Sequence, residues 1–314
     1  MKCLAAKHMS SCPYPPLRAH LRGIADRRGV FQAVSLINGT SSKILTAYSD
    51  IYYRDPALFN KQSTVDRYID DIAYTFGVTR SALNVTAVAK GLVAGAVTFC
   101  RRDGTTVDAA VDREGMLVPS LKDVLSVSVS AVQRILVVEK EATFRSIAAS
   151  ALWKTISTRG VLVTAKGYPD LATRALLRLL STPSPQNRFC SPSVYGLVDY
   201  DPDGLAILST YRYGSAKLAH EAADLQLPQL QWLGLRSSHF SSGKIMDRSD
   251  QGLLTLTQRD RRKARLMLGW DALADDDEIR DELRTMLMLN VKAELQTLDG
   301  IPSGMVDLLE NSLH

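Results

Sequence analysis

The sequence is poor in the residues that build disulfide frameworks and transition-metal sites. Its 314 residues include four cysteines, which are widely spaced and form no CxxC pair. The five histidines follow no spacing that is typical of metal ligands. Both patterns argue against a disulfide framework and against a zinc or iron site, so we expect reduced thiols in a protein that works inside a cell. The cysteines are Cys3, Cys12, Cys100 and Cys190.

Long hydrophobic runs are also missing. No stretch approaches the roughly 18 consecutive apolar residues that a membrane span needs. The N-terminal segment has only a brief apolar patch, which His8 soon interrupts, so a secretory signal is not expected. Hydrophobic residues make up 46% of the chain and charged residues 23%, as in ordinary globular proteins. The length is sufficient for two domains with sizeable cores.

The charge is moderately basic. The formal net charge is +5 and the pI is near 9.0, which fits a nucleic acid or another anionic partner. The segment 258–270, QRDRRKARLMLGW, concentrates basic residues around a short apolar stripe. Two interpretations stay open for it, a solvated helix face and a face that contacts phosphates.

The first part of the chain suggests a small helical domain with a hairpin. Residues 1–30 are expected to be poorly structured, because several prolines lie close together there. Apolar residues recur with helical spacing from Gln62 to Phe76, Ser63 or Thr64 can cap that helix, and Gly77 can end it. A second helix is expected over 86–95, followed by two short strands around an Asp-Gly turn at 103–104. Helix, turn, helix and hairpin predict a winged-helix domain over 31–118.

After about residue 119 the pattern changes to alternating strands and helices. Short apolar runs at 134–140, 160–167 and 194–201 are separated by helical segments at 142–156 and 170–181. Such alternation predicts a parallel sheet flanked by helices in a second domain over 119–314. In these sheets ligands bind beyond the carboxyl ends of the strands.

Acidic residues stand at those predicted strand ends. Glu139 lies at the end of one predicted strand, and Asp199 and Asp201 lie at the end of another. Several carboxylate oxygens are what Mg²⁺ prefers, and alternation would turn both aspartates to one side if the strand persisted to Asp201. Pro202 and Gly204 then turn the chain into a helix whose N-terminus favours phosphate. The acids could instead be turn and cap residues, but the strand-terminal glutamate favours a metal site.

Two adjacent tyrosines, Tyr52 and Tyr53, precede an Asp-Pro pair. A phenol has a pKa of about 10, so a tyrosine acts as a nucleophile only with help from a base, a cation or a metal-polarised electrophile. Packing is the default role of a tyrosine without such a partner. A DNA-binding domain with a tyrosine beside a magnesium-type domain suggests attack on a DNA phosphodiester.

Ten segments, in order and with consistent spacing between about residues 49 and 296, resemble a known family. That family comprises the meiotic DNA double-strand-break proteins (sporulation protein eleven) and the A subunits of topoisomerase VI. The segments are DIYYRDPALF, VDRYIDDIA, AKGLVAG, ILVVEKEATF, KGYPDLATR, VDYDPDG, YRYGS, WLGL, LTQRDRRKA and KAELQ.

The resemblance implies an α+β and α/β chain, in which an N-terminal winged-helix (CAP-like) domain precedes a Toprim domain with a C-terminal helical extension. It implies that Tyr53 is the nucleophile, that Tyr52 packs, and that Glu139, Asp199 and Asp201 bind Mg²⁺. It also implies a homodimer, a GHKL-type B or B-like subunit, meiotic accessory proteins, double-stranded DNA as substrate, and a place on chromosomes in the nucleus. The DNA-contacting residues expected from the basic segments and strand ends are Arg54, Lys90, Lys166, Arg261, Arg262 and Lys263.

The sequence departs from the family at Ser49, where relatives have an arginine four residues before the nucleophile. Losing that cation weakens charge stabilisation in phosphoryl transfer, unless Arg54 or another basic residue replaces it. The N-terminal arm is also shorter than usual, which favours an imperfect gene model or a truncated chain.

Three functions remain open on the sequence. The first is Mg²⁺-dependent DNA double-strand-break formation through a 5′-phosphotyrosyl link, which initiates meiotic recombination. The second is the A subunit of a topoisomerase VI, which acts with an ATP-hydrolysing partner. The third is a non-catalytic DNA-binding relative.

Overall fold

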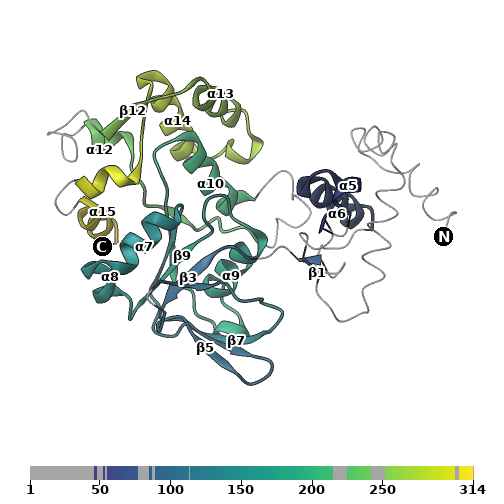
Figure 1. The fold of residues 1–314 in the computed structure, drawn as a ribbon. Coiled ribbons are helices and arrows are strands. Elements are labelled where there is room, and N and C mark those ends of the chain that lie inside the picture. Colours follow the sequence, from purple (N-terminus) through teal and green to yellow (C-terminus); the bar gives the residue numbers. More distant parts are fainter. Residues whose placement is uncertain are drawn as a thin grey trace. The chain divides into compact units, whose positions relative to one another are not determined.

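The computed structural model describes residues 46–47, 52–53, 55–76, 85–86, 89–112, 114–214, 225–241, 252–300 and 304–313. The chain divides into two compact units, Met1–Val88 and Ala89–His314, and we describe each by itself (Figure 1). The poorly structured arm expected over 1–30 lies outside the described residues. No helix in the described part of the chain is long and apolar enough to cross a membrane.

The first unit contains α5 (Pro56–Phe59), α6 (Gln62–Phe76) and a parallel pair of short strands, β1 (Thr46–Ala47) and β2 (Val85–Thr86). Asp55 starts α5, because its carboxylate accepts the Leu58 N–H at 3.0 Å and Pro56 occupies the first turn.

The apolar stripe predicted for α6 is confirmed. Val65, Ile69 and Ile72 are buried, and Tyr68 packs edge-on against Phe59 with ring centroids 6.3 Å apart. The last described residue of α6 is Phe76, and Gly77, which was predicted to end the helix, lies outside the described residues. The predicted capping by Ser63 or Thr64 is wrong, because α6 already begins at Gln62 and both residues lie in its first turn.

The second unit carries the other described elements. Its strands are β3 (Leu92–Gly95), β4 (Thr98–Arg101), β5 (Thr106–Asp108), β6 (Met116–Leu117), β7 (Val124–Ser128), β8 (Arg134–Val138), β9 (Gly160–Thr164), β10 (Ser193–Leu197), β11 (Gln231–Trp232), β12 (Leu253–Thr255) and β13 (Val291–Ala293). Its helices are α7 (Glu141–Ala149), α8 (Ala151–Ile156), α9 (Leu171–Ser181), α10 (Pro202–Tyr213), α12 (Ser237–Ser241), α13 (Gln258–Met267), α14 (Asp277–Leu289) and α15 (Gly304–Leu313), with 3-10 turns η2 (Pro185–Asn187), η6 (Asp271–Leu273) and η7 (Leu295–Gly300).

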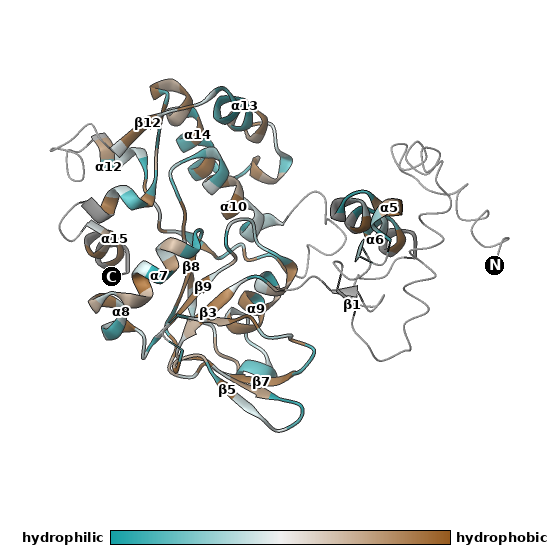
Figure 2. Ribbon diagram, viewed as in Figure 1, coloured by the Kyte–Doolittle hydropathy of each residue, from teal (hydrophilic) through white to brown (hydrophobic). Residues whose placement is uncertain are grey.

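A six-stranded mixed sheet forms the centre of this unit, with strand order β11-β10-β8-β9-β3-β6. β8, β9, β10 and β11 are parallel, whereas β3 runs antiparallel to β9 and β6 antiparallel to β3. The parallel strands and intervening helices are therefore confirmed, and the antiparallel edge was not predicted. β9 is buried along its whole length, and Figure 2 shows hydrophobic colouring along the central strands.

The direction of the crossovers explains where the helices lie. The connection from β8 to β9 moves one way along the sheet, and the connections from β9 to β10 and from β10 to β11 move the other way. Because such crossovers are right-handed, α7 and α8 must cover one face, and α9 and α10 the opposite face. Figure 1 shows this arrangement.

The helix expected over 86–95 is wrong. Residues 92–95 instead form β3, which lies between β9 and β6. Periodicity cannot separate a short buried strand from a short buried helix segment, and burial between two strands decided the outcome. The hairpin around Asp103 and Gly104 is confirmed, since β4 pairs antiparallel with β5, and β7 adds a third strand to it.

These pairings place residues 92–117 in the second unit. The structural division falls after Val88, whereas the sequence predicted one after residue 118. The winged-helix arrangement expected for 31–118 stays a prediction, because much of its first part lies outside the described residues.

Gly95 offers a test of this packing. Its φ is +108°, and a Cβ added there would lie 2.2 Å from the Gly160 carbonyl oxygen. We expect Gly95→Ala to lower the free energy of unfolding by about 3 kcal/mol, because both the backbone conformation and the neighbouring strand oppose a side chain.

Gly104→Ala is the matched control, since its φ is +85° but nothing lies within 4 Å of the added Cβ. Its expected cost is about 1 kcal/mol, from backbone conformation alone. Urea denaturation of both variants gives the comparison, and equal costs would contradict the proposed packing of β3 on β9.

Candidate active site at the carboxyl ends of the parallel strands

The site lies where the direction of the crossovers changes. β8 connects toward β9 and β10 connects toward β11, so the connections that leave the neighbouring strands β8 and β10 run in opposite directions along the sheet. Such a switch point is where open α/β sheets bind ligands. Glu139 follows β8, and Asp199 follows β10 by two residues. The condition set by the sequence, that the two strands must be neighbours, is therefore met.

Glu139 and Asp199 are in direct contact. The Asp199 backbone N–H donates to the Glu139 carboxylate, with 3.0 Å between N and Oε2. The main chain of Glu139 is held by the Leu197 carbonyl, which accepts its N–H at 3.1 Å. Its own carbonyl accepts the Gly167 N–H at 2.8 Å, so three strand ends fix its position.

The side chain of Asp199 is buried and has two partners. Its Oδ1 accepts the Leu295 N–H at 2.9 Å, and its Oδ2 lies 2.8 Å from the Lys140 ammonium. The chain beyond β13 reaches this position because Tyr200 and Ala293 exchange backbone hydrogen bonds of 2.9 and 3.0 Å. A segment almost 100 residues downstream thus completes the surroundings of Asp199.

Asp201 is the N-cap of α10. Its Oδ1 accepts the Gly204 N–H at 2.7 Å, and Pro202 occupies the first helical turn. The condition that the strand persists to Asp201 is not met, because β10 ends at Leu197 and Tyr200 forms only an isolated bridge. The N-cap role and a metal-ligand role are compatible for Asp201, because the cap uses only one of its two carboxylate oxygens.

The electrostatics show that the three carboxylates share one neighbourhood. Burial, and then the charge of Asp199, raise the pKa of Glu139 to about 8, with a smaller contribution from Asp201. Burial also raises the pKa of Asp201, and Asp199 adds to that shift. Several ionised carboxylates close together and away from water have an unfavourable electrostatic free energy, and a bound cation offsets it.

Oxygen donors fit a hard divalent cation, but the present geometry is not a finished metal cage. Within the described ranges, no group of three His, Cys, Asp or Glu side chains is placed to hold a metal ion. Both oxygens of Asp199 already have partners, the Leu295 N–H and the Lys140 ammonium. The donor chemistry and the charge fit magnesium, provided that Lys140 gives up its contact.

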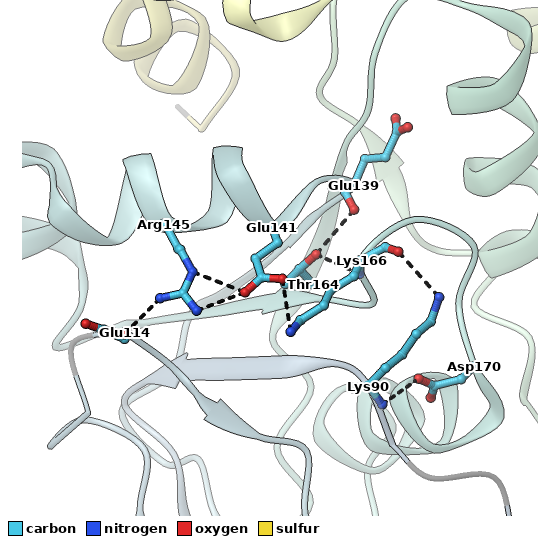
Figure 3. Close-up of polar contacts among 8 residues, drawn as sticks. All are labelled: Lys90, Glu114, Glu139, Glu141, Arg145, Thr164, Lys166 and Asp170. Carbon is cyan, nitrogen blue, oxygen red and sulfur yellow. Dashed lines mark hydrogen bonds and ion pairs between the residues drawn. The ribbon is translucent and has the colours of Figure 1, made fainter. Parts of the chain in front are cut away.

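The lysines at the end of β9 form a separate polar cluster (Figure 3). Lys166 has a φ of +57°, and its ammonium lies 3.0 Å from Glu141, not on Glu139. The Glu139 carboxylate points away from this cluster in Figure 3. Lys90 donates from Nζ to the Lys166 carbonyl at 3.4 Å, while its backbone N–H donates to Asp170. Lys90 and Lys166 are therefore neighbours, and their assignment to DNA binding stays a prediction.

The three basic residues of α13 that were expected to contact DNA have different surroundings. Arg261 donates to the Leu256 carbonyl at 2.8 Å and to the Asn290 side chain at 2.9 Å, so it holds the helix in place. Arg262 is exposed. Lys263 contacts the carboxylate of Asp203 and the hydroxyl of Tyr168.

Tyr168 and Asp203 were not singled out from the sequence, although both stand in segments that resemble the family, KGYPD and DPDG. Burial lowers the pKa of Lys263, but its hydrogen bonds with these two residues outweigh burial and raise the pKa overall. Lys263 is therefore a charged partner of the Asp203 carboxylate, close to the Asp201 cap.

Tyr53 lies in the first unit, with a side chain that is 71% exposed. Its ring stands edge-on to Tyr52, with centroids 5.2 Å apart, and Tyr52 is only partly exposed. This contrast agrees with a packing role for Tyr52 and an accessible phenol at Tyr53. Arg54 and Ser49 lie outside the described residues.

Comparison with known proteins gives matches in both units. Residues 134–307 match the Toprim domain family of Spo11 and the A subunit of topoisomerase 6, and residues 44–85 match the family "Type IIB DNA topoisomerase". The chain is 37% identical over 254 residues to the meiotic recombination protein rec12 of Schizosaccharomyces pombe, covering 81% of this chain and 68% of that protein.

Two further relatives show the breadth of the match. The human meiotic recombination protein SPO11 is 34% identical over 254 residues, covering 81% of this chain and 62% of that protein. The A subunit of DNA topoisomerase 6 from Arabidopsis thaliana is 34% identical over 252 residues, covering 80% of this chain and 56% of that protein. The chain thus spans less than two thirds of the human protein and of the Arabidopsis protein. It belongs to the family of Spo11 and the topoisomerase VI A subunits, and its second unit contains the family's Toprim domain.

Proposed function

We propose that this protein forms DNA double-strand breaks by a topoisomerase-like transesterification that initiates meiotic recombination. The observation that carries the proposal is the contact of Glu139 with Asp199 at the switch point, with Asp201 two residues further along as the cap of α10. An acidic cluster of this kind suits a divalent cation and a transferring phosphoryl group. Relatives that carry the name meiotic recombination protein support the same reaction.

In the proposed step the Tyr53 phenolic oxygen attacks a backbone phosphorus atom. A bond forms between that oxygen and phosphorus, and the bond from phosphorus to the 3′ oxygen breaks. The phenol loses one proton and the 3′ oxygen gains one, so no oxidant and no net proton is consumed. The 5′ end of the DNA stays linked to the protein, and the 71% exposure of Tyr53 leaves room for a duplex to approach.

The three carboxylates would hold Mg²⁺, which when bound supplies positive charge beside the scissile phosphate and the departing 3′ oxygen. Glu139 can offer the oxygen that is not held by Asp199, and Asp201 the oxygen that is not used in the cap of α10. The charge of these groups is the reason to expect a divalent cation rather than a water molecule.

Among the proposed DNA contacts, the structure supports two more than the others. Arg262 is exposed, and Lys90 lies at the carboxyl end of β9, on the edge that carries the acids. Arg261 is occupied in holding α13, Lys166 is paired with Glu141 and Lys263 with Asp203, so the charges of these three are available only in part. Arg54 remains a proposal from the family resemblance.

The proposed assembly follows the names of the relatives. A protein named as the A subunit of a topoisomerase works with a second kind of chain, and we propose a GHKL-type B or B-like partner for this protein. A homodimer that places Tyr53 of one copy at the carboxylates of the other, meiotic accessory proteins and a nuclear, chromosomal location complete the proposal.

The second candidate is the A subunit of a topoisomerase VI. It is favoured by relatives named as A subunits of DNA topoisomerase 6, at 35% identity in rice and 34% in Arabidopsis thaliana. The two candidates share the cleavage chemistry and differ in whether a broken duplex is resealed after strand passage. ATP-dependent decatenation with a GHKL-type partner would favour this second function over break formation.

Replacing the nucleophile tests the shared chemistry. Tyr53→Phe removes only the attacking oxygen, so we expect loss of the covalent protein–DNA species while duplex binding stays within about twofold. The species is measured in cells undergoing meiosis by recovering DNA that remains attached to the denatured protein.

Tyr52→Phe is the matched control, because it removes a hydroxyl from the neighbouring ring and should leave the adduct unchanged. Covalent linkage that persists in the Tyr53→Phe variant would contradict the assignment of Tyr53 as the nucleophile. No linkage in any variant, together with magnesium-dependent duplex binding, would favour a non-catalytic DNA-binding protein.

Asp201→Asn tests the metal site directly. An asparagine oxygen can still accept the Gly204 N–H, so α10 keeps its cap and the free energy of unfolding should change by less than about 0.5 kcal/mol. The lost charge should weaken Mn²⁺ binding by roughly tenfold or more, as measured by calorimetric titration.

Asp108→Asn is the control for this experiment. Asp108 is an exposed carboxylate that accepts the Ala110 N–H at 2.9 Å, and its replacement should change neither stability nor Mn²⁺ affinity. Equal Mn²⁺ affinity in the wild type and in Asp201→Asn would place the cation elsewhere.

A further inference from the structure

Lys140 links two of the family-like segments in a way that the proposed chemistry leaves unexplained. It follows Glu139 in the segment ILVVEKEATF, and its ammonium reaches the segment KAELQ. Its Nζ lies 2.8 Å from Asp199 Oδ2, 3.3 Å from Glu294 Oε2 and 3.4 Å from Gln296 Oε1. One cation therefore touches a carboxylate of the acidic site and a second set of acceptors outside it.

The two carboxylates that contact Lys140 have different surroundings. The Asp199 side chain is 3% exposed, whereas the Glu294 side chain is 50% exposed. An ion pair with a buried carboxylate is stronger and less screened than one at the surface. Without a metal ion, Lys140 therefore compensates the charge of Asp199 above all.

The two partners of Asp199 also differ in mobility. The Leu295 N–H belongs to the backbone beside the bridge between Tyr200 and Ala293, so it cannot withdraw without breaking that pairing. The Lys140 side chain is 34% exposed and pivots about several single bonds. When a cation approaches Asp199, the lysine is the partner that can leave.

We propose that Lys140 is a displaceable counter-cation of the acidic site and that Glu294 receives it when a divalent cation binds Asp199. This inference rests on the proposed metal site formed by Glu139, Asp199 and Asp201. It explains why the carboxylates meet at the switch point without forming a finished metal cage. Lys140 is thus a positioning residue whose charge sets the affinity of the site.

A purely structural role for Lys140 predicts the opposite result. If the lysine only held Asp199 in the orientation that the metal needs, its removal would weaken metal binding. If it competes with the metal, its removal must strengthen binding, because the competitor is gone and the site is more negative. The sign of one affinity change separates the two roles.

The experiment is a Mn²⁺ titration of the full chain, by calorimetry or by the electron spin resonance of free Mn²⁺. We expect Lys140→Met to tighten Mn²⁺ binding by about tenfold, since contacting charged groups commonly couple by one or more kcal/mol. Lys140→Gln serves as a second uncharged variant if the methionine variant does not fold. Lys140→Arg keeps the charge and should bind Mn²⁺ within about threefold of the wild type.

Glu294→Gln tests the receiving partner. Without the glutamate charge the displaced lysine is less stable, so Mn²⁺ binding should weaken by roughly threefold to tenfold. In the Lys140→Met background Glu294→Gln should not change Mn²⁺ affinity, because that variant has no lysine that Glu294 could bind after displacement. A Glu294 effect that persists in that background would identify Glu294 as a metal ligand and overturn its assigned role.

The outcomes also separate this inference from the metal site itself. If the wild type binds no Mn²⁺, or if Asp201→Asn leaves binding unchanged, the proposed metal site fails. If binding depends on Asp201 but Lys140→Met weakens it or leaves it unchanged, only the counter-cation role fails. Urea denaturation of each variant confirms that folded protein is being compared.

Discussion

The hydrogen bond from the Asp199 N–H to the Glu139 carboxylate is the interaction on which the site depends. It joins the ends of two neighbouring parallel strands at the point where their connections diverge. Because it brings a second carboxylate beside Glu139 in a buried place, it also creates the local excess of negative charge. The fold therefore determines both the position of the acids and the excess of negative charge that a bound cation would neutralise.

Cations from distant parts of the chain surround this acidic site. Lys140 pairs with Asp199 and Lys263 with Asp203, while Lys292 lies 2.8 Å from Asp260 and its charge partly offsets the raised pKa of Asp201. Each lysine comes from a different element, so the balance of charge is a property of the folded domain and not of one motif. A basic segment such as α13 therefore cannot be interpreted as a DNA-binding face from its charge alone.

Much of the second unit could be predicted from its sequence. The buried strands β8, β9 and β10 and the helices between them have strong and unambiguous apolar patterns, and the faces that the helices cover follow from right-handed crossovers. The acids at the strand ends were predicted for the same reason. The ten segments that resemble the family pointed to Tyr53 over Tyr52, a choice that periodicity alone does not make.

The sequence predictions that the structure contradicts, and the contacts that were not predicted, have identifiable physical causes. Residues 92–95 are apolar over too short a stretch to distinguish helix from strand, and their pairing with β9 depends on residues far along the chain. The path beyond β10 is set by the contact with Ala293, which lies outside any local pattern. The contacts of Lys140 cannot be predicted from local sequence, because its partners Glu294 and Gln296 are more than 150 residues away.

The most direct measurement is the anomalous diffraction of crystals of the full chain soaked in Mn²⁺ and compared with crystals soaked in a chelator. We predict an anomalous peak in coordination contact with Glu139, Asp199 and Asp201, with the Lys140 ammonium moved from Asp199 to Glu294. A peak bound by other residues, or one at these carboxylates with the Lys140–Asp199 pair intact, would contradict this account of the site.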